Sequence, residues 1–378
     1  MTTQEILSRG VAQILPDPQT LAAKMAAGPI KLYLGIDPTG GTLHLGHSVA
    51  LRKLQQFAQA GHHVILLIGN GTVRICDPSG RDSARPMLSD DEIAANFQTW
   101  KEQASKILDF ERIEIKHNGD WLDKLTYADL VRLLAKTTVQ QLLERDMFQN
   151  RLAHNLPIYG HEIIYPLLQG YDSVAMDVDL EIGGSDQTFN MLVGRDLQKI
   201  YNNHDKWILT VPIINGLDGR KMSKSFNNYI ALTAPPDEMY AKTMSATDEV
   251  VMDYFTLLTD VPDEEIAAMR RELSNGANPM IFKKKLAHTL VSFYHSPQAA
   301  DQAAIRWQET VSEKKIPENI PEIHVPSFDL PLLELAKICQ PQASKSHLRR
   351  LEQQGAVQML PDHVLKIGRR DFYKLYTL

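Results

Sequence analysis

Two short segments carry residue types that could bind a nucleoside triphosphate. One is His44-Leu45-Gly46-His47, and the other, about half the chain later, is Lys221-Met222-Ser223-Lys224-Ser225. Imidazole N–H and lysine ammonium groups can donate to phosphate oxygens and stabilise charge that develops during attack at phosphorus. Either segment alone is weak evidence, because histidine pairs also cap helices or bind metals and lysine-rich turns are common on surfaces. Together they predict a triphosphate site.

The first segment follows a glycine-rich loop. Leu32–Ile36 has the apolar character of a buried strand, the loop spans 35–41, and the next helix begins at the two histidines. Glycines permit close backbone approach, and a helix N-terminus favours anions. The second segment follows turn residues 215–218, so it is expected to be a mobile loop that closes over the β- and γ-phosphates. No suitably spaced third Cys, His or Glu accompanies the histidine pair, so no metal site is predicted.

Short apolar runs alternate with helical patterns in the first half of the chain. The runs expected as strands are 32–36, 64–68, 113–115, 178–182 and 208–211, with helical segments such as 51–58 and 90–108 between them. Fully apolar strands are buried on both faces, as in parallel sheets flanked by helices. This order predicts an α/β fold with a doubly wound, Rossmann-like parallel sheet and with ligands at the carboxyl ends of its strands.

The second half of the chain is different. Helices are expected at 235–243, 263–274, 279–294 and 297–311, followed by a proline-rich stretch, a basic helix at 345–354 and short strands at 355–357 and 364–367. Four prolines between 316 and 331 would interrupt a helix and are typical of a linker. The predicted organisation is a catalytic domain at 1–228, an α-helical domain at 229–315, a linker at 316–335 and a small α+β domain at 336–378.

Composition and charge narrow the classes of protein. The chain has 378 residues, 43% of them hydrophobic and 23% charged, which is ordinary for globular domains. The N-terminus lacks a secretory signal, the longest aliphatic run is too short to cross a bilayer, and Cys76 and Cys339 cannot form a disulfide framework. These features predict a cytoplasmic protein that binds no membrane. Net charge is −6, yet residues 344–378 carry a net +4, which predicts a polyanionic partner at the tail.

The two chemical segments together resemble the hallmark motifs of class I aminoacyl-tRNA synthetases. Leu45 replaces the commoner isoleucine of the first motif, and the Lys-Met-Ser-Lys-Ser loop is matched in every letter. Further segments are similar to the bacterial tyrosyl-tRNA synthetases, and the resemblance covers essentially the whole chain. These segments are Tyr33, Asp37, Asp77-Pro78-Ser79-Gly80, Tyr165-Pro166-Leu167-Leu168-Gln169-Gly170-Tyr171-Asp172 and Gly183-Gly184-Ser185-Asp186-Gln187.

This resemblance implies a tyrosine-tRNA ligase with a two-step reaction. The tyrosine carboxylate attacks the α-phosphate of ATP, giving tyrosyl-adenylate and pyrophosphate, and the tyrosyl group then passes to the 3'-terminal ribose of tRNA(Tyr). ATP would act as a substrate with Mg²⁺ on its triphosphate, and no tightly bound cofactor is expected. The implied assembly is a homodimer with tRNA lying across both subunits, joined through residues 121–147.

The resemblance also implies roles for individual residues. Adenylate formation would use Thr39, His44, His47, Lys221 and Lys224. Tyrosine would be bound by Tyr33 and Asp172 at its phenolic hydroxyl, by Asp77, Tyr165 and Gln169 at its ammonium group, and by Asp37 and Gln187. ATP would lie against Gly46, Gly184, Asp186 and Lys224.

The spacing of Tyr165, Gln169 and Asp172 is compatible with a binding face. These residues lie at i, i+4 and i+7, so one helix face presents all three, although an ordinary solvent-facing stripe has the same spacing. Tryptophan is the close competitor as substrate, but an indole offers a donor and no acceptor to the Tyr33–Asp172 pair. Parts of the sequence would also suit a nucleotidyltransferase that uses only the first motif, or a noncatalytic RNA-binding protein. The nucleotidyltransferase would not need the lysine loop, and the noncatalytic protein would not keep both histidines and both lysines.

The C-terminal tail resembles a small RNA-binding domain shared with a ribosomal small-subunit protein. That resemblance places Lys345, Arg349 and Arg350 on tRNA phosphates, although a solvated basic helix has the same composition. The chain departs from the usual pattern at 358–361, where Gln-Met-Leu-Pro replaces an Asn-Gly hairpin turn. It also has Arg74 and Cys76 before Asp77, where small residues are more typical.

Overall fold

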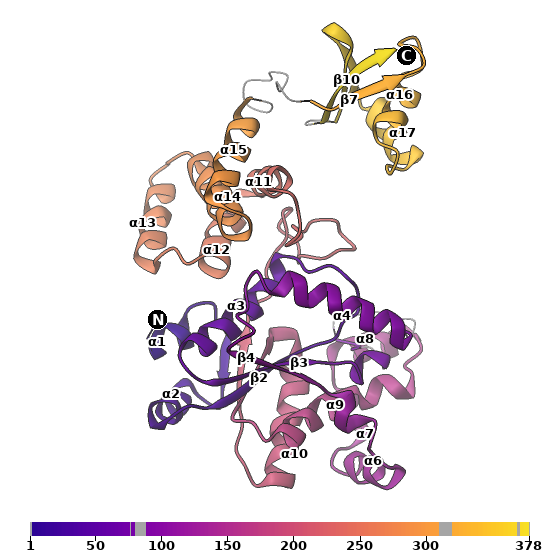
Figure 1. The fold of residues 1–378 in the computed structure, drawn as a ribbon. Coiled ribbons are helices and arrows are strands. Elements are labelled where there is room, and N and C mark those ends of the chain that lie inside the picture. Colours follow the sequence, from indigo (N-terminus) through magenta and orange to yellow (C-terminus); the bar gives the residue numbers. More distant parts are fainter. Residues whose placement is uncertain (1, 76, 80–87, 310–319, 369–370, 378) are drawn as a thin grey trace. The chain divides into compact units, whose positions relative to one another are not determined.

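The computed structural model describes residues 2–75, 77–79, 88–309, 320–368 and 371–377 (Figure 1). Among the residues singled out above, Cys76, Gly80 and residues 310–319, which include the last two residues of the helix expected at 297–311, lie outside this description. Contacts divide the chain into two compact units, residues 1–234 with 242–286 and residues 235–241 with 287–378. Within the described ranges, no helix is long and apolar enough to cross a membrane.

A six-stranded sheet organises the first unit. Its order is β1-β6-β5-β2-β3-β4, with β1 antiparallel to β6 and all other neighbours parallel. The strands are β1 (Gln13–Leu15), β2 (Lys31–Ile36), β3 (His63–Ile68), β4 (Ile113–His117), β5 (Leu180–Gly184) and β6 (Trp207–Val211). The chain runs outward from β2 to β4 and then from β5 to β6 on the other side, so the strand order reverses between β2 and β5. The predicted doubly wound α/β fold is confirmed, and such a reversal opens a crevice at the carboxyl ends of the strands.

Helices cover both faces of this sheet. Consecutive residues of β2 and β3 are buried, as strands with two covered faces require. Helix α3 packs against β2, β3 and β5, and α10 packs against β5 and β6. The helices are α1 (Thr3–Ser8), α2 (Pro18–Ala27), α3 (Leu45–Gln59), α4 (Asp90–Ala104), α5 (Gly119–Leu122), α6 (Tyr127–Leu134), α7 (Val139–Leu143), α8 (Asp146–Ala153), α9 (Gly160–Met176) and α10 (Thr188–Asn202), with 3-10 turns η1 (Thr72–Arg74) and η2 (Ser185–Gln187).

A run of helices follows the sheet. It consists of α11 (Pro236–Met244), α12 (Asp248–Leu258), α13 (Asp263–Ser274), α14 (Pro279–Tyr294) and α15 (Pro297–Trp307), and the described residues between 236 and 307 form no strand. Four of these helices were predicted. The sequence prediction missed α12, because its buried residues, from Val250 to Leu258, include consecutive apolar positions and so leave no clean helical stripe.

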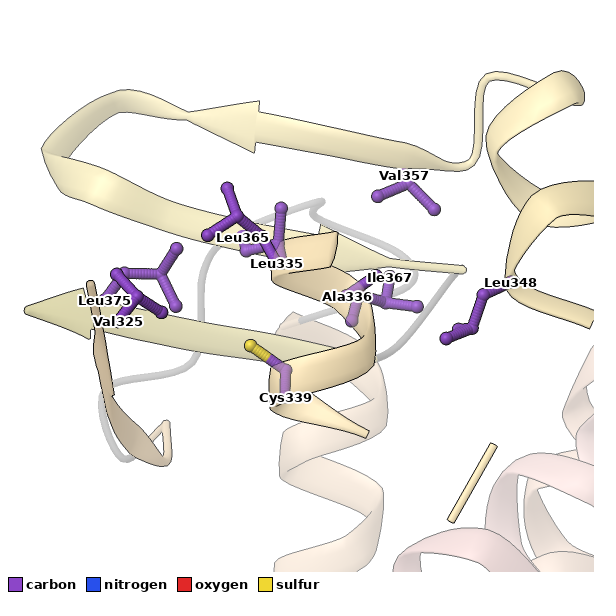
Figure 2. Packing of buried hydrophobic residues seen from close by; sticks show 9 residues of the cluster. All are labelled: Val325, Leu335, Ala336, Cys339, Leu348, Val357, Leu365, Ile367 and Leu375. Carbon is purple, nitrogen blue, oxygen red and sulfur yellow. The ribbon is translucent and has the colours of Figure 1, made fainter. Parts of the chain in front are cut away.

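The end of the chain forms a four-stranded sheet covered by two helices. The strands β7 (Glu322–Val325), β8 (Val357–Leu360), β9 (Val364–Ile367) and β10 (Asp371–Thr377) have the order β7-β10-β9-β8, and the helices are α16 (Leu332–Cys339) and α17 (Lys345–Gln353). Figure 2 shows their shared core, formed by Val325, Leu335, Ala336, Cys339, Leu348, Val357, Leu365, Ile367 and Leu375. Strand β7 and the start of α16 fall within 316–335, the range expected as a linker. The prolines there flank an edge strand, a position that tolerates them.

The strand expected at 355–357 and the turn expected at 358–361 both lie later in the chain than predicted. Gly355 has a positive φ of 66° and ends α17, so the expected strand at 355–357 begins only at Val357. Residues 358–360 continue β8 instead of turning. The reversal is made by Asp362 and His363, both with φ of 58°, a conformation that aspartate tolerates better than most residues.

Candidate active site

A cavity of about 220 Å³ opens between β2 and β5, at the carboxyl ends of these strands. Nine of the residues singled out from the sequence line it, namely Tyr33, Asp37, Thr39, Asp77, Tyr165, Gln169, Asp172, Gly184 and Gln187. Three of them share one face of α9, as their spacing predicted, while Leu167 and Leu168 of the same helix are buried in an apolar cluster. The fold therefore gathers these nine residues from four separate stretches of sequence around one small cavity.

One wall of the cavity contains Tyr33 and Asp172, both buried. The Tyr33 hydroxyl lies 2.9 Å from Ser173 Oγ. Asp172 accepts hydrogen bonds from Trp121 Nε1 at 2.8 Å and from Asn118 Nδ2 at 3.1 Å. Burial raises the pKa of the Asp172 carboxyl well above its usual value, although these two hydrogen bonds oppose the rise. This wall thus presents a phenol and a carboxyl group to a ligand.

Asn118 and Trp121 were not predicted as site residues. They follow β4, so they stand at the same edge of the sheet as the other site residues. That position after a strand is the signal that could have identified them, because the carboxyl ends of parallel strands meet at one edge.

A second wall is rich in hydrogen-bond acceptors. Asp37 accepts from the Tyr165 hydroxyl and from Thr72 Oγ1, each at 2.8 Å. Asp77 accepts from Gln187 Nε2 at 2.7 Å. Two carboxylates held in this way favour a positively charged ligand group such as an ammonium ion. Thr72 was not predicted, since it belongs to no recognised motif.

Glu181 forms part of the cavity floor. It is aligned with Tyr33 in the β2–β5 register, and its Oε1 accepts from Gln169 Nε2 at 3.1 Å. Asn190 Nδ2 donates to Gln169 Oε1 at 2.9 Å. Lys206 lies behind the floor and forms an ion pair with Glu181. The prediction missed both charged residues, although a glutamate inside an apolar strand was a detectable signal.

The first motif forms the N-terminus of α3. Gly46 N donates to His44 Nδ1 at 3.1 Å, and His44 N donates to His47 Nδ1 at 3.1 Å. Burial, the neighbouring imidazole and the Lys224 charge lower the pKa of His44 to about 2, and burial with Lys224 lowers the pKa of His47 to about 4. Both rings are therefore neutral at neutral pH. Because each Nδ1 accepts a backbone N–H, the proton is assigned to Nε2, which remains a donor for a phosphate oxygen.

Gly46 is required by this arrangement. A Cβ atom at Gly46 would lie 2.9 Å from the His44 ring, closer than van der Waals contact allows. The glycine of the motif thus makes room for the capping imidazole, and the capping bond fixes the direction of the ring.

The two motifs meet in space. A Cβ atom at Gly40 would lie 3.5 Å from Lys224 Nζ, so that lysine stands beside the glycine-rich loop. The chain after the lysine loop pairs with the start of α3 and the residues before it, through Leu45 N to the Ile230 carbonyl and Leu232 N to the Leu43 carbonyl, each 3.0 Å. This pairing explains why motifs so distant in sequence are adjacent.

The base of the lysine loop is held in place. Asn228 is buried, accepts from Ser223 N at 2.8 Å and donates to Asp218 Oδ1 at 2.7 Å. Lys221 Nζ lies 3.4 Å from Asp186 Oδ2, beside η2. Lys221 is partly exposed, so the loop presents cations to the site from a fixed base.

A family model described as tRNA synthetases class I (W and Y) matches residues 25–312. The chain belongs to this family. The synthetase is 44% identical over 393 residues to the tyrosine–tRNA ligase of Moorella thermoacetica, with 98% of this chain and 95% of the relative covered. It is 42% identical over 394 residues to that of Thermotoga maritima, with 99% and 98% covered.

Solved structures resemble the synthetase in fold. A C-terminally truncated mitochondrial tyrosyl-tRNA synthetase of Aspergillus nidulans gives a TM-score of 0.69 at 22% identity, covering 81% of this chain and 93% of that one. A tyrosyl-tRNA synthetase of Archaeoglobus fulgidus complexed with L-tyrosine gives 0.64 at 20% identity, covering 80% and 98%. At these identities the likeness establishes the fold.

The basic residues predicted for the tail of the synthetase share one helix. Lys345, Arg349 and Arg350 are exposed on α17, while Leu348 points into the core of the small domain (Figure 2). No group of three or more His, Cys, Asp or Glu side chains among the described residues is arranged to hold a metal ion.

Proposed function

We propose that this aminoacyl-tRNA synthetase is a tyrosine-tRNA ligase, which activates L-tyrosine with ATP and transfers it to the 3'-terminal ribose of tRNA(Tyr). The observation that carries the proposal is the pairing of two chemically different walls in one cavity. Tyr33 and Asp172 suit a phenolic hydroxyl, and the acceptors around Asp37 and Asp77 suit an ammonium group. In this assignment Tyr165 and Gln169 complete the ammonium site, and Gln187 lies near the reacting carboxylate.

Selection of tyrosine follows from the unpaired groups that other amino acids would leave. Phenylalanine would leave the cavity-facing hydrogen-bonding positions of Tyr33 and Asp172 unmatched, and an unsatisfied buried polar group costs about 1 to 3 kcal/mol. Tryptophan has an N–H donor but no acceptor for the Tyr33 hydroxyl.

Adenylate formation requires positioning and charge stabilisation more than proton transfer. The tyrosine carboxylate is already a nucleophile, so the site must hold it in line with the α-phosphate and stabilise the leaving pyrophosphate. Donors for the phosphate oxygens are the Nε2–H groups of His44 and His47, together with Thr39, Lys221 and Lys224. The adenosine would lie against Gly46, Gly184 and Asp186. Mg²⁺ would arrive bound to the triphosphate, as it commonly does with nucleotides, and would neutralise phosphate charge.

The parts after the catalytic domain are proposed to bind tRNA. Residues 229–315 would contact the anticodon region, and the small domain within 336–378 would bind tRNA phosphates through Lys345, Arg349 and Arg350. Their exposure on α17 and the positive charge of the tail support this assignment. The substrates ATP and tRNA are cytoplasmic, so we place the enzyme in the cytoplasm.

A homodimer is proposed through residues 121–147. Apolar side chains in this range are exposed, including Tyr127 at 85%, Val131 at 44% and Val139 at 58%. Contiguous exposed apolar residues commonly mark protein interfaces. Substituting Val139→Glu should lower the sedimentation coefficient from that of a dimer to that of a monomer, and a wild type that sediments as a monomer would contradict the assembly.

Pyrophosphate exchange into ATP across a panel of amino acids tests the function. Tyrosine should support exchange, and Lys224→Ala should lose most of it because the pyrophosphate loses a cation. The exposed Lys24→Ala is a control from the same unit, outside the proposed dimer interface, that should exchange normally. Equal exchange with tryptophan, or none with any amino acid, would refute the proposal.

A further inference from the structure

Lys206 is a fully buried lysine outside the cavity, immediately before β6. Its ammonium group pairs with Glu181 and donates to Ser173 Oγ at 2.8 Å. It also lies 6.0 Å from the centre of the Tyr33 ring. Burying a charge is costly unless it is paired and hydrogen-bonded, so a lysine in this position requires an explanation.

The surroundings of Lys206 leave room for its ammonium group. Helices α9 and α10 approach closely, and a Cβ atom at Gly194 would lie 2.7 Å from Lys206 Nζ and 3.1 Å from Ser173 Oγ. A glycine thus stands where any side chain would displace the contact between the lysine and the serine.

The contacts of Lys206 constrain the direction of a hydrogen-bond chain. An ammonium group has donors only, so Ser173 Oγ accepts from Lys206. The serine has one hydrogen left to donate, and among the described residues Tyr33 Oη, at 2.9 Å, is its remaining hydrogen-bond partner. If Ser173 donates to Tyr33, the hydrogen of Tyr33 points away from the serine and toward the cavity, where Glu181 is its other side-chain hydrogen-bond partner.

We propose that Lys206 is a positioning residue for amino-acid selection, which sets the order Lys206 to Ser173 to Tyr33 and makes Tyr33 a donor to the phenolic oxygen of tyrosine. The inference rests on the proposed function and adds a specificity residue to it. The phenolic oxygen then accepts from Tyr33 and donates its own hydrogen to Asp172, so every group is paired. With the Ser173–Tyr33 bond reversed, Tyr33 and Asp172 would both face the phenol as acceptors for a single hydrogen. Phenylalanine has no oxygen at the phenolic position, so its binding does not depend on the direction of this hydrogen-bond chain.

Burial and the nearby charges of Glu181 and Asp172 raise the pKa of Tyr33 well above its ordinary value. The hydroxyl therefore keeps its hydrogen over the whole range in which the enzyme is assayed. This condition is necessary for the role of Tyr33 as a donor.

The test compares tyrosine and phenylalanine in pyrophosphate exchange. Lys206→Met should lower kcat/KM for tyrosine about tenfold, the effect of leaving one buried polar group unsatisfied, mainly through KM. The kcat/KM for phenylalanine should stay unchanged. In a Ser173→Ala background the relay, meaning the hydrogen-bond chain from Lys206 through Ser173 to Tyr33, is already broken. Lys206→Met should then have no further effect on the ratio of kcat/KM for tyrosine to kcat/KM for phenylalanine.

Matched variants separate this role from a structural one. Lys53 is also buried and donates to the Ile6 and Arg9 carbonyls, so Lys53→Met loses a buried lysine without touching the relay and should leave the ratio unchanged. Lys206→Met leaves the Glu181 carboxylate without its ion-pair partner. The double variant Lys206→Met, Glu181→Gln is therefore compared with Glu181→Gln alone, so that an unpaired carboxylate does not contribute to the difference. If Lys206→Met does not fold, Ser173→Ala alone must lower the ratio, since it removes the donor to Tyr33.

Three outcomes would overturn the inference: a folded Lys206→Met with the wild-type ratio, an equal loss for both amino acids, or the full effect in the Ser173→Ala background. Failure of the proposed function would look different. The wild type itself would then show no preference for tyrosine.

Discussion

His44 and His47 take their chemical state from burial. Their pKa values of about 2 and about 4 leave both imidazoles neutral, so they act through oriented N–H dipoles rather than as cations. In a buried site such fixed donors stabilise developing charge without having to reorganise.

We expect kcat for pyrophosphate exchange to be flat around pH 6.5, where an ordinary histidine titrates. The depressed pKa values mean that neither imidazole gains a proton until the solution is far more acidic. A pH profile at saturating tyrosine and ATP checks this. An inflection near pH 6.5 that disappears in His47→Gln would contradict it.

Asp172 should make tyrosine binding sensitive to acid. Its pKa is raised, so the carboxylate that accepts the phenolic hydrogen is lost as pH falls through a value higher than that of an ordinary aspartate. KM for tyrosine should therefore rise on acidification while kcat changes less. Asp172→Asn cannot titrate, so its KM should be higher but independent of pH, and an unchanged pH dependence would assign the effect to another group.

Among the elements, helices α9 and α10 pack closely against each other, and α9 carries three of the residues that line the cavity. A Cβ atom at Gly170 would lie 2.9 Å from Leu197 Cδ1 and 3.0 Å from the backbone nitrogen of Gly194. Helix α9 carries Gln169, Asp172 and Ser173, and helix α10 carries Gly194. Their spacing therefore sets the position of the phenol-binding wall.

Gly170→Ala should destabilise the protein by about 1 to 3 kcal/mol, because the new methyl group forces the backbones apart. Urea unfolding measures the loss, and KM for tyrosine should rise with it. Gly160→Ala is the matched control on the same helix, where a Cβ atom meets nothing within 4 Å. Equal free energies of unfolding for the two variants would contradict the prediction, because they would show that the contact between α9 and α10 accommodates the methyl group.

In the molecule as a whole, the tail is a folding unit that begins before its basic residues. Val325 and Leu335 share a core with Leu348 and Leu375, so a cut at Ser344 would expose half of that core. Removing residues 310–378 takes out this small domain together with its whole core. We expect this deletion to leave tyrosine-dependent pyrophosphate exchange unchanged and to weaken tRNA charging, and unchanged charging would refute a role of the tail.

Replacing Lys345, Arg349 and Arg350 with glutamine tests the same role without a deletion. The KM for tRNA should rise and become less dependent on salt, because fewer counterions are released on binding. These side chains are exposed, so the unfolding midpoint should not change. A salt dependence equal to that of the wild type would place the phosphate contacts elsewhere.

Local patterns in the sequence were enough to predict the fold class, the two motifs and the helix face with Tyr165, Gln169 and Asp172, because buried strands, glycine-rich loops and helical spacing are each visible within a short segment. The partners of those residues depend on the tertiary structure. Ser173, Lys206 and Asn118 belong to no local pattern. Asn118 joins the site because parallel strands place their carboxyl ends at one edge, whereas Ser173 comes from α9 and Lys206 reaches it from the start of β6.

The neutral state of the histidines also arises in three dimensions, since burial and a lysine from the far half of the chain set their pKa values. Strand β7 escaped prediction because its proline-flanked sequence becomes a strand only by pairing with β10, about fifty residues later. Short segments thus carry the chemistry of this synthetase, whereas contacts between distant segments set the protonation, direction and partners of each group.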